Sequence, residues 1–564
     1  MKKTLLFLFL CTSLTSIAQV TNEGEPASWK LSTKDAITAI TLPQVNIQKI
    51  KNEDVINDKD KTKPYRIGVL QKVNYGLENA GTWTTLSNGD RIWRVLFQSK
   101  DAVHLSVVFD KFYIPKGGKL YLYNDSKTDL LGAYTAVQNN KEEVLTTWFV
   151  NGDTLWIEYY EPKEEKGRGK LNISSVIHGY RIGHTYQKGY FNDKEKVLNG
   201  SGDCNLDVNC PIGTDFETQK NLLKKAVAFL IMPETGSSSA FICSGTLINN
   251  TSQDKKPYFL TANHCFNNTA SPSNYTFRFN WISANPICAS TANSTNGPMN
   301  FTISGATLRA RNANSDFMLV EINNPIPAAW DVTYAGWDRS DTTPSFVVGI
   351  HHPQGDIMKI CRDDSGVIKA PHAAGGSPVA QTWEITTAGN GWELGVTEGG
   401  SSGSALFDSN GRIIGQLYGG QAACSTTSTT TNNGRLDFYG RFAVSWNSGS
   451  TSSLRLRDWL DPSGTNQTTL DAKENVLAVN DEFLEKNITL FPNPSSGVIQ
   501  IRITGLVGDL NYEVYNLLGQ TLLSSKLQNN EIIFLDNLPN DIYFVKIIEA
   551  DTNRSLVKKI VLNK

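Results

Sequence analysis

Short runs of alternating apolar and polar residues, separated by glycine, proline, aspartate and asparagine turns, recur along this chain of 564 residues. Between residues 65 and 162 such runs cover 91–97, 103–109, 119–123 and 154–160. Alternation with frequent turns is typical of a β-sandwich. We therefore predict an all-β domain here, and we expect the polar and charged residues 20–60 before it to form a loosely held leader.

Two further stretches show the same kind of pattern. Within residues 197–472, runs rich in β-branched and aromatic residues predict an antiparallel barrel fold with strands at 225–232, 241–248, 257–262, 275–281, 317–322, 346–350, 412–418 and 441–446. A short closing helix is expected at 454–460, because Pro462 follows it. Residues 473–486 are charged and linker-like, and residues 487–564 alternate again, which predicts a small β-sandwich.

The first residues have the pattern of a secretory signal peptide. Two lysines precede an apolar run at 5–11, and small residues lie before Gln19, so residues 1–19 are expected to be removed on export. No later segment is long and apolar enough to span a membrane. The net charge of −2 gives no reason to expect nucleic-acid binding.

Cysteine usage agrees with export. Seven cysteines remain after the signal peptide, and all lie between residues 204 and 424. An exported domain with this content is expected to be braced by disulfides, with one thiol left over. A metal site is the competing interpretation, but no Cys-x-x-Cys pair is present. We therefore expect neither a metal nor a cofactor.

Three segments in the same part of the chain carry candidate chemistry. They are Leu-Thr-Ala-Asn-His-Cys at 260–265, Asn-Ser-Asp-Phe-Met-Leu-Val at 314–320 and Gly-Gly-Ser-Ser-Gly-Ser at 399–404. A serine hydroxyl becomes a nucleophile when an imidazole takes its proton and a buried carboxylate holds the imidazole in the right tautomer. The order of His264, Asp316 and Ser402 resembles that of the chymotrypsin-like serine endopeptidases, which implies a double β-barrel fold.

That resemblance also implies a role for each residue. Ser402, rather than Ser401 or Ser404, is the nucleophile, His264 the general base and Asp316 the group that orients it. The amides of Gly400 and Ser402 form the oxyanion hole. The other carboxylates considered for the third position lack the apolar run that would bury one; they are Asp363 and Asp364.

Within this group the chain resembles the lysyl endopeptidases in the segments 201–211, 243–247, 257–265, 349–356 and 395–398. The resemblance implies three disulfides and leaves Cys361 unpaired; the pairs are Cys204–Cys424, Cys210–Cys288 and Cys243–Cys265. It also implies cleavage after lysine, with protein and peptide substrates.

The specificity pocket departs from that of trypsin. The residue six positions before the nucleophile is Val396 and not an aspartate. In the lysyl endopeptidases an aspartate before Tyr-Gly-Arg fills this role, which corresponds to Asp437 here. Tyr418 stands where the family often has a histidine beside the triad, and its stacking partner is Trp383 or Trp392.

Residues 20–196 are expected to form a propeptide, with Lys196 in an exposed hinge as the expected cleavage site. Ser401 stands where trypsin-type zymogens carry an aspartate that pairs with the new N-terminus. We therefore expect inhibition to depend on the propeptide. The alternative is a permanent substrate-binding or surface-binding module.

The final segment resembles the C-terminal sorting domain of the type IX secretion system. Its marks are Phe-Pro-Asn-Pro at 491–494, Tyr-Asn-Leu-Leu-Gly at 515–519 and a late Lys-Lys-Ile-Val run. This implies export through the periplasm and across the outer membrane to the cell surface or medium, with the type IX machinery as a partner. A carbohydrate-binding module is the alternative, but no aromatic platform pattern supports it.

The sequence thus predicts a secreted serine endopeptidase that acts through an acyl-enzyme and is made as a precursor. Two alternatives stay open: broader cleavage after lysine and arginine, and a non-catalytic adhesion protein on a protease-like scaffold.

Overall fold

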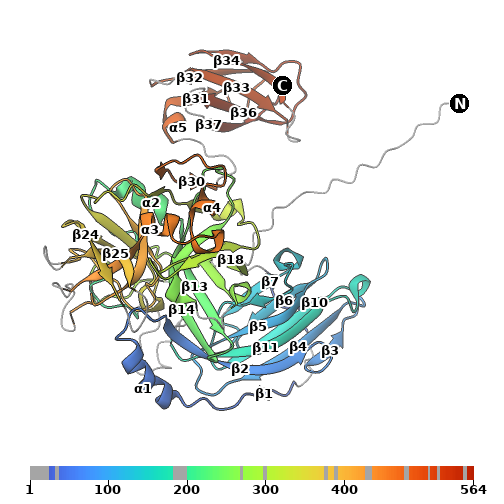
Figure 1. Cartoon of the computed structure of the whole chain (residues 1–564). Helices are drawn as coiled ribbons and strands as arrows, with labels where there is room; N and C mark the ends of the chain where they lie inside the picture. Colours follow the sequence, from blue (N-terminus) through green and yellow to red (C-terminus); the bar gives the residue numbers. More distant parts are fainter. Residues whose placement is uncertain are drawn as a thin grey trace. The chain divides into compact units, whose positions relative to one another are not determined.

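The computed structural model describes residues 24–31, 37–181, 200–266, 271–295, 297, 301–373, 379–386, 391–425, 435–475, 482–505, 509–516, 521–549 and 555–564. The signal peptide and the hinge with Lys196 lie outside these residues. Strands dominate throughout, so the all-β prediction is confirmed. The chain forms two compact units, residues 1–475 and 476–564 (Figure 1).

The N-terminal part of the first unit is a two-layered β-structure. Its outer sheet has the order β1-β4-β10-β6-β7, with β3 paired to β4. Alternate residues of both layers, such as Phe97, Val107 and Ile157, are fully buried between them. The bounds of the outer strands are β1 Ile40–Thr41, β3 Thr82–Thr85, β4 Arg91–Gln98, β6 Lys119–Tyr123, β7 Leu130–Tyr134 and β10 Thr154–Glu161. Those of the inner layer are β2 Tyr65–Gly76, β5 His104–Tyr113, β8 Leu145–Thr146, β9 Val150–Asn151 and β11 Lys170–Gly179.

The described residues of the predicted leader, 24–31 and 37–60, do not form the loose segment that the sequence predicts. They include the helix α1 (Ile47–Asn57), which begins with Asn46 accepting a hydrogen bond from the Lys49 amide at 3.0 Å. The helix carries almost no apolar stripe. A buried carboxylate, Asp54, fixes it to the β-structure through Arg66. This ionic anchor has no periodic signature in the sequence, which is why the prediction is wrong.

Residues 200–475 form two further strand sets. The first comprises β13 Val227–Glu234, β14 Ser239–Leu247, β15 Tyr258–Ala262, β16 Thr276–Phe279, β17 Phe301–Ser304, β18 Ala306–Asn312 and β19 Phe317–Ile322. The second comprises β12 Leu206–Asp207, β22 Val347–His351, β23 Lys359–Asp363, β24 Val367–His372, β25 Ala380–Ile385, β26 Ala405–Phe407, β27 Ile413–Gly420 and β28 Asp437–Arg441, with β21 Trp337–Asp338 and β29 Thr469–Leu470 alongside. These two packed sets provide the two-part scaffold that the double-barrel prediction requires.

One predicted strand of this region is a helix. Residues 441–446 were expected to be extended, but α3 spans Phe442–Asn447. Phe442 and Trp446, four positions apart, both pack against Trp337, which satisfies a helical spacing that a short run cannot distinguish from a strand. The predicted closing helix at 454–460 is present as the short α4 (Arg457–Leu460).

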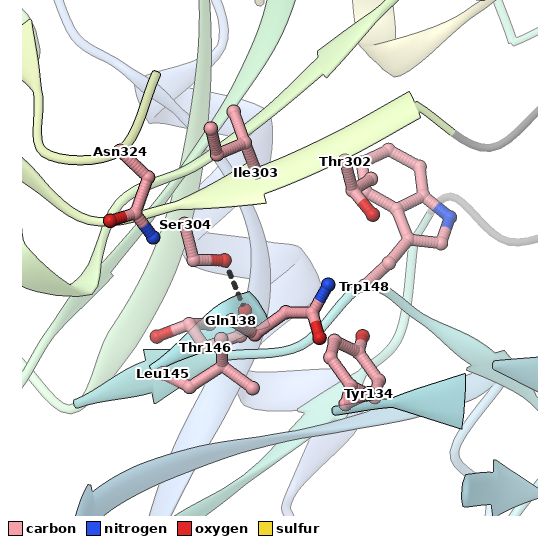
Figure 2. A pocket seen from close by; sticks show the side chains of 9 residues that line it. All are labelled: Tyr134, Gln138, Leu145, Thr146, Trp148, Thr302, Ile303, Ser304 and Asn324. Atoms are coloured by element: carbon pink, nitrogen blue, oxygen red, sulfur yellow. Dashed lines mark hydrogen bonds between the residues drawn. The ribbon is translucent and has the colours of Figure 1, made fainter. Parts of the chain in front are cut away.

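The N-terminal β-structure is continuous with the second part of the first unit. Strand β2 pairs antiparallel with β14, so the inner layer and the first strand set share one twelve-stranded sheet (Figure 1). Phe229 and Trp281 enter the same apolar core as the inner layer. Near this junction a small pocket is lined by polar and apolar side chains, and Ser304 donates to the Thr146 carbonyl (Figure 2). Thr276 donates to the same carbonyl.

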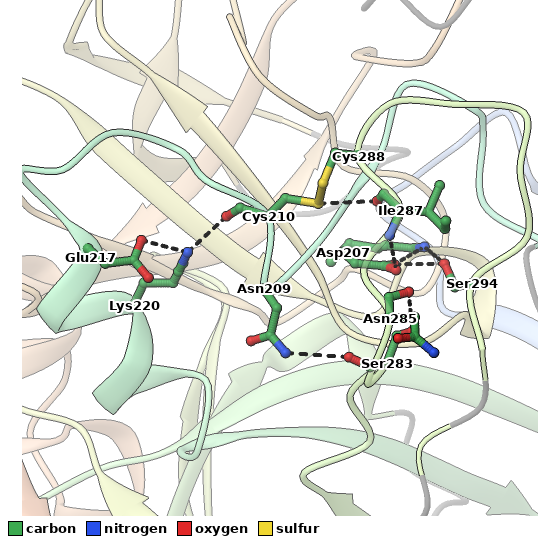
Figure 3. The surroundings of a disulfide bond; sticks show 11 residues. Asp207, Asn209, Cys210, Glu217, Lys220, Ser283, Asn285, Ile287, Cys288 and Ser294 are labelled. Atoms are coloured by element: carbon green, nitrogen blue, oxygen red, sulfur yellow. Dashed lines mark hydrogen bonds and ion pairs between the residues drawn. A yellow bond between two sulfur atoms is a disulfide. The ribbon is translucent and has the colours of Figure 1, made fainter.

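Three disulfides brace residues 200–475, with the pairs that the family resemblance implies: Cys204–Cys424, Cys210–Cys288 and Cys243–Cys265. Cys361 is a buried free thiol. Around Cys210–Cys288, Lys220 of α2 (Glu217–Leu223) donates to the Cys210 carbonyl at 2.9 Å (Figure 3).

The second unit contains a three-stranded sheet, a four-stranded sheet and a short helix. The linker is shorter than 473–486: β30 (Lys473–Glu474) pairs with β20 (Thr333–Tyr334) in the first unit, and α5 (Glu482–Asn487) packs within the second. No helix within the described residues combines the length and the apolar character needed to cross a membrane. The strands are β31 Ile488–Phe491, β32 Val498–Ile503, β33 Leu510–Tyr515, β34 Thr521–Leu527, β35 Ile532–Phe534, β36 Ile542–Glu549 and β37 Ser555–Val561.

Candidate active site

His264 and Asp316 meet at the ends of two paired strands. His264 follows β15 and Asp316 precedes β19, and these strands pair antiparallel. The imidazole Nδ1 lies 2.7 Å from Asp316 Oδ2, and the backbone amide of His264 donates to Oδ1 at 2.9 Å. Burial raises the pKa of Asp316, and the adjacent His264 offsets part of that rise. This geometry holds the imidazole with Nε2 directed away from the carboxylate.

Ser402 lies in a tight turn just before β26. Gly400 and Gly403 have φ values of +92° and +81°, a region that L-residues rarely adopt. A Cβ on Gly403 would lie 2.1 Å from Thr261 Oγ1, so the turn packs directly against β15. Within the described residues, the amides of Gly400 and Ser402 donate to no acceptor. Two such free amides are what an oxyanion hole requires.

The neighbouring serine has a different environment. Ser401 Oγ lies 2.7 Å from Nδ1 of His351 and accepts a hydrogen bond from the Glu398 amide at 3.1 Å. Both side chains are fully buried, and burial lowers the pKa of His351 well below its ordinary value. Ser401 therefore has a structural place inside the loop, and His352 likewise bonds its own loop through the Asp356 carbonyl.

Asp437 begins β28 and is completely buried. Its Oδ2 accepts hydrogen bonds from Trp392 Nε1 at 2.8 Å and Thr397 Oγ1 at 2.7 Å, and its Oδ1 accepts one from the Ala422 amide at 3.2 Å. A Cβ on Gly420 would lie 2.0 Å from Oδ1, so only glycine leaves room for this carboxylate. Asp437 is thus an oriented buried anion prepared to receive a cation.

A lysine from the N-terminal region fills that place. The Nζ of Lys61 lies 3.1 Å from Asp437 Oδ1, 2.7 Å from the Thr397 carbonyl and 3.0 Å from Thr397 Oγ1. Its carbonyl accepts a hydrogen bond from Ser402 Oγ at 3.2 Å. The lysine side chain is only 10% exposed. Sequence reasoning missed Lys61, because one lysine in a charged segment gives no signal of a partner 376 positions away.

The remaining predicted residues lie as follows. The Tyr418 ring is 6.0 Å from that of His264 and 5.3 Å from that of Phe438. Of the two tryptophans considered as stacking partners, Trp392 bonds Asp437 and Trp383 donates to the Ile414 carbonyl.

The alternative carboxylates are engaged elsewhere. Asp363 accepts hydrogen bonds from the amides of Ser365 and Gly366, and burial raises its pKa to about 7. Asp364 pairs with Arg362.

One cluster in the described part of the chain has the composition of a metal site: Cys243, His264 and Cys265. The two sulfurs are bonded to each other in a disulfide and so cannot act as thiolate ligands. The disulfide instead ties the residue after His264 to β14.

Two parts of the chain match models of known protein families. Residues 198–440 match the family model "Lysyl endopeptidase, C-terminal domain", and residues 489–563 match "Secretion system C-terminal sorting domain". A lysyl endopeptidase of Pseudomonas aeruginosa is 29% identical over 302 residues, which cover 52% of this chain and 61% of that protein. The alignment thus spans about three fifths of the relative's length.

Solved structures show only a distant likeness. A protease from M. tuberculosis in its active form gives a TM-score of 0.25 at 14% identity, covering 40% of this chain and 78% of that one. The MamO protease domain from Magnetospirillum magneticum gives 0.24 at 13%, covering 40% and 95%.

The first unit therefore contains a domain of the serine-protease class. More particularly, residues 198–440 are similar to the C-terminal domain of lysyl endopeptidases, and residues 489–563 are similar to a secretion system C-terminal sorting domain, which indicates export.

Proposed function

We propose that this protein is an exported serine endopeptidase that cleaves on the C-terminal side of lysine and is made as a precursor. The observation that carries the proposal is Lys61: its ammonium contacts the buried Asp437 while its carbonyl lies at the hydroxyl of Ser402. A lysine can thus reach the pocket carboxylate and the candidate nucleophile with the same residue.

The proposed reaction follows from the geometry of the site. His264 Nε2 removes the proton of Ser402, whose Oγ attacks the carbonyl carbon of the substrate lysine. The amides of Gly400 and Ser402 stabilise the oxyanion, and Asp316 stabilises the imidazolium. His264 then protonates the leaving amine. In the second half, His264 takes a proton from water, the water oxygen attacks the acyl carbon, and the Ser402 oxygen leaves and takes that proton back from His264.

The preference for lysine rests on the shape of the charge site. The ammonium has three hydrogens, and its neighbours in the pocket are three oxygens: one of Asp437 and two of Thr397. A planar guanidinium is wider and presents its donors as a fork, which this compact arrangement does not match. Arginine substrates are therefore expected to bind less well.

The other proposed roles concern maturation and export. Residues 20–196 act as an inhibitory propeptide, and the C-terminal domain addresses the protein to the type IX secretion machinery. The continuity of β2 with β14 supports the first role, because the N-terminal region covers the site while it remains attached.

The test is mass spectrometry of a denatured protein mixture digested by the processed enzyme. We expect cleavage almost only after lysine, none with Ser402→Ala, and loss of the lysine preference with Asp437→Asn while Ser402 still reacts with an organophosphonate. Asp316→Asn should lower the rate strongly, whereas its control Asp364→Asn, changed at a half-exposed ion pair, should not.

Equal cleavage after lysine and arginine would favour the broader trypsin-like alternative. A Ser402 that neither cleaves nor reacts with the probe would favour the non-catalytic one.

A further inference from the structure

The chain around Lys61 is folded back on itself. The Lys63 amide donates to the Asp60 carbonyl at 3.1 Å, and the Thr62 amide donates to Asp60 Oδ1 at 3.1 Å. Asp60 in turn donates to the carbonyl of Asn57, at the end of α1. These bonds make residues 60–63 a tight turn with Lys61 near its tip.

Both ends of this turn are anchored. On one side, Asp54 of α1 is 1% exposed and accepts hydrogen bonds from Arg66 at 2.7 Å and Tyr180 at 2.6 Å, and it pairs with Arg181 at 2.9 Å. On the other side, β2 begins at Tyr65, which pairs with β14. These contacts on both sides of the turn fix the position at which Lys61 enters the pocket.

The candidate active site is already assembled while this turn is in place. Glu398, in the loop before Ser402, accepts hydrogen bonds from the Gly202 amide at 2.9 Å and from Asn205 Nδ2 at 3.0 Å. The His264–Asp316 pair and the Asp437 donors are also formed. Because these groups are already in place in the uncleaved chain, occupancy of the site is the feature of the structure that would keep a precursor inactive.

The bound lysine is held in a geometry that does not lead to cleavage. The Ser402 hydroxyl donates to the Lys61 carbonyl oxygen, and within the described residues His264 Nε2 has no hydrogen-bond partner. The same carbonyl is not bound by the amides of Gly400 or Ser402. Proton transfer to His264 and stabilisation of the oxyanion are therefore both absent from this arrangement.

The turn itself opposes cleavage as well. A peptide substrate binds most readily as an extended strand along a sheet edge. The internal hydrogen bonds of the turn fold the chain back instead, and Thr62 Cγ2 lies 2.6 Å from where a Cβ of Gly419 would be.

We infer that Lys61 is a built-in pseudosubstrate: the turn at residues 60–63 places a lysine in the enzyme's own specificity pocket and blocks the precursor without being cut. The inference rests on the proposed function and adds the residue, the pocket and the geometry through which the propeptide acts. Removal of the side chain of Lys61 should open the pocket even though the rest of the propeptide stays docked.

The experiment uses the full-length precursor with Ser402→Ala, which cannot process itself. A fluorescent hexapeptide with one lysine is titrated and followed by anisotropy. We expect at least about fifty-fold tighter binding when Lys61→Ala is added, because the competing internal lysine is gone. Lys63→Ala is the matched control: that lysine is half-exposed, and its ammonium contacts Asp60 and Asn57 but not Asp437, so binding should stay at the level of the parent.

A second measurement does not depend on any change at Lys61. In the Ser402→Ala precursor, an amine-reactive reagent should modify Lys61 at least about tenfold more slowly than Lys63, as read by mass spectrometry, since only the second is solvent-accessible. Equal rates would overturn the inference, and so would unchanged peptide binding in the Lys61→Ala precursor.

The outcomes separate the two proposals. If the processed enzyme cleaves after lysine but the Lys61→Ala precursor stays closed, the inference fails and the proposed function stands. If the opened precursor binds a lysine peptide no better than its alanine counterpart, the proposed specificity fails. With Ser402 intact, cleavage at Lys61–Thr62 before any other bond would overturn the non-productive geometry.

Discussion

Two buried lysine–aspartate pairs in this protein have the same chemical groups, but the lysine is held differently in each. In one, Lys61 contacts Asp437, and the hydroxyl of Thr397 donates to the carboxylate and accepts from the ammonium. In the other, Lys359 contacts Asp207 at 2.6 Å, and the hydroxyl of Ser294 has the same double role.

The difference lies in what holds each lysine. Lys359 and Asp207 are direct partners across β23 and β12, beside the Cys210–Cys288 disulfide, so the sheet itself fixes the pair (Figure 3 shows the Asp207–Ser294 side). Lys61 lies on a turn before the residues that match the protease family model, and we propose that a substrate lysine replaces it. In the proposed function, a structural ion pair and a specificity pocket thus share one chemistry and differ in whether the cation lies on a strand of the same sheet or on a turn from the N-terminal region.

The largest expected effect comes from neutralising each carboxylate. Asp437→Asn should lower kcat/KM of the processed enzyme for a lysine substrate by about a thousandfold, the cost of leaving a buried ammonium without its partner. Asp207→Asn should leave the ratio of lysine to arginine cleavage unchanged and lower stability instead. Kinetics on matched lysine and arginine esters, with urea unfolding, check both; a specificity change in Asp207→Asn would contradict the comparison.

Replacing each lysine with methionine should lower the free energy of unfolding to a different extent in the two pairs. Lys359→Met leaves Asp207 buried without its cation, and Asp356, which lies 3.5 Å from the same ammonium, loses it too. We expect a loss of about 3–5 kcal/mol in the free energy of unfolding.

Lys61→Met should cost the precursor less, because one carboxylate, Asp437, loses its cation there, whereas Lys359→Met removes the cation from two. Urea unfolding of the two variants in the Ser402→Ala precursor decides this. Equal losses would mean that the pocket pair is structural as well.

The pH dependence of the Lys359 pair has a definite sign. Burial disfavours the ammonium, but the carboxylates of Asp356 and Asp207 outweigh it and raise the pKa of Lys359 above its ordinary value near 10.5. Its contribution is therefore complete below pH 10.5 and is lost as the pH rises through the folded-state pKa. The stability gap between the parent and Lys359→Met should be constant from pH 7 to 10 and shrink above that; a gap that widens would refute the assignment.

The smallest expected effect concerns the two bridging hydroxyls. Thr397→Val should lower kcat/KM for lysine substrates by about tenfold, while Ser294→Ala should lower the free energy of unfolding by about 1 kcal/mol, each the usual value of one hydrogen bond to a charged pair. Parallel kinetics and unfolding of both variants provide the check. Thr397→Ser, which keeps the hydroxyl, is the control for the first and should remain close to the parent.

Much of the site could be predicted because its parts lie in local segments. His264, Asp316 and Ser402 each stand in a short motif, and the predicted strand 317–322 coincides with β19. Asp437 could be proposed from its place before Tyr-Gly-Arg, although nothing local indicates that it is buried.

Two elements were predicted wrongly, because their local patterns do not determine their structure. The helix α1 is anchored by Asp54, whose partners Arg66, Tyr180 and Arg181 are 12 to 127 positions away, so no periodic pattern announces it. The helix α3 was expected as a strand, because Phe442 and Trp446 in a run of six residues fit either period.

The sequence by itself determined the local chemistry: the strands, the motif residues, the cysteines and the class of sorting domain, each of which depends on neighbours within a few positions. The tertiary structure decided which distant groups meet. The contact of Lys61 with Asp437 and Ser402 joins residues more than three hundred positions apart, and its reason is the pairing of β2 with β14 and the ionic anchor of α1. Burial then makes the surrounding hydrogen bonds necessary, since a lysine and an aspartate removed from water have only each other and their hydrogen-bond partners for compensation.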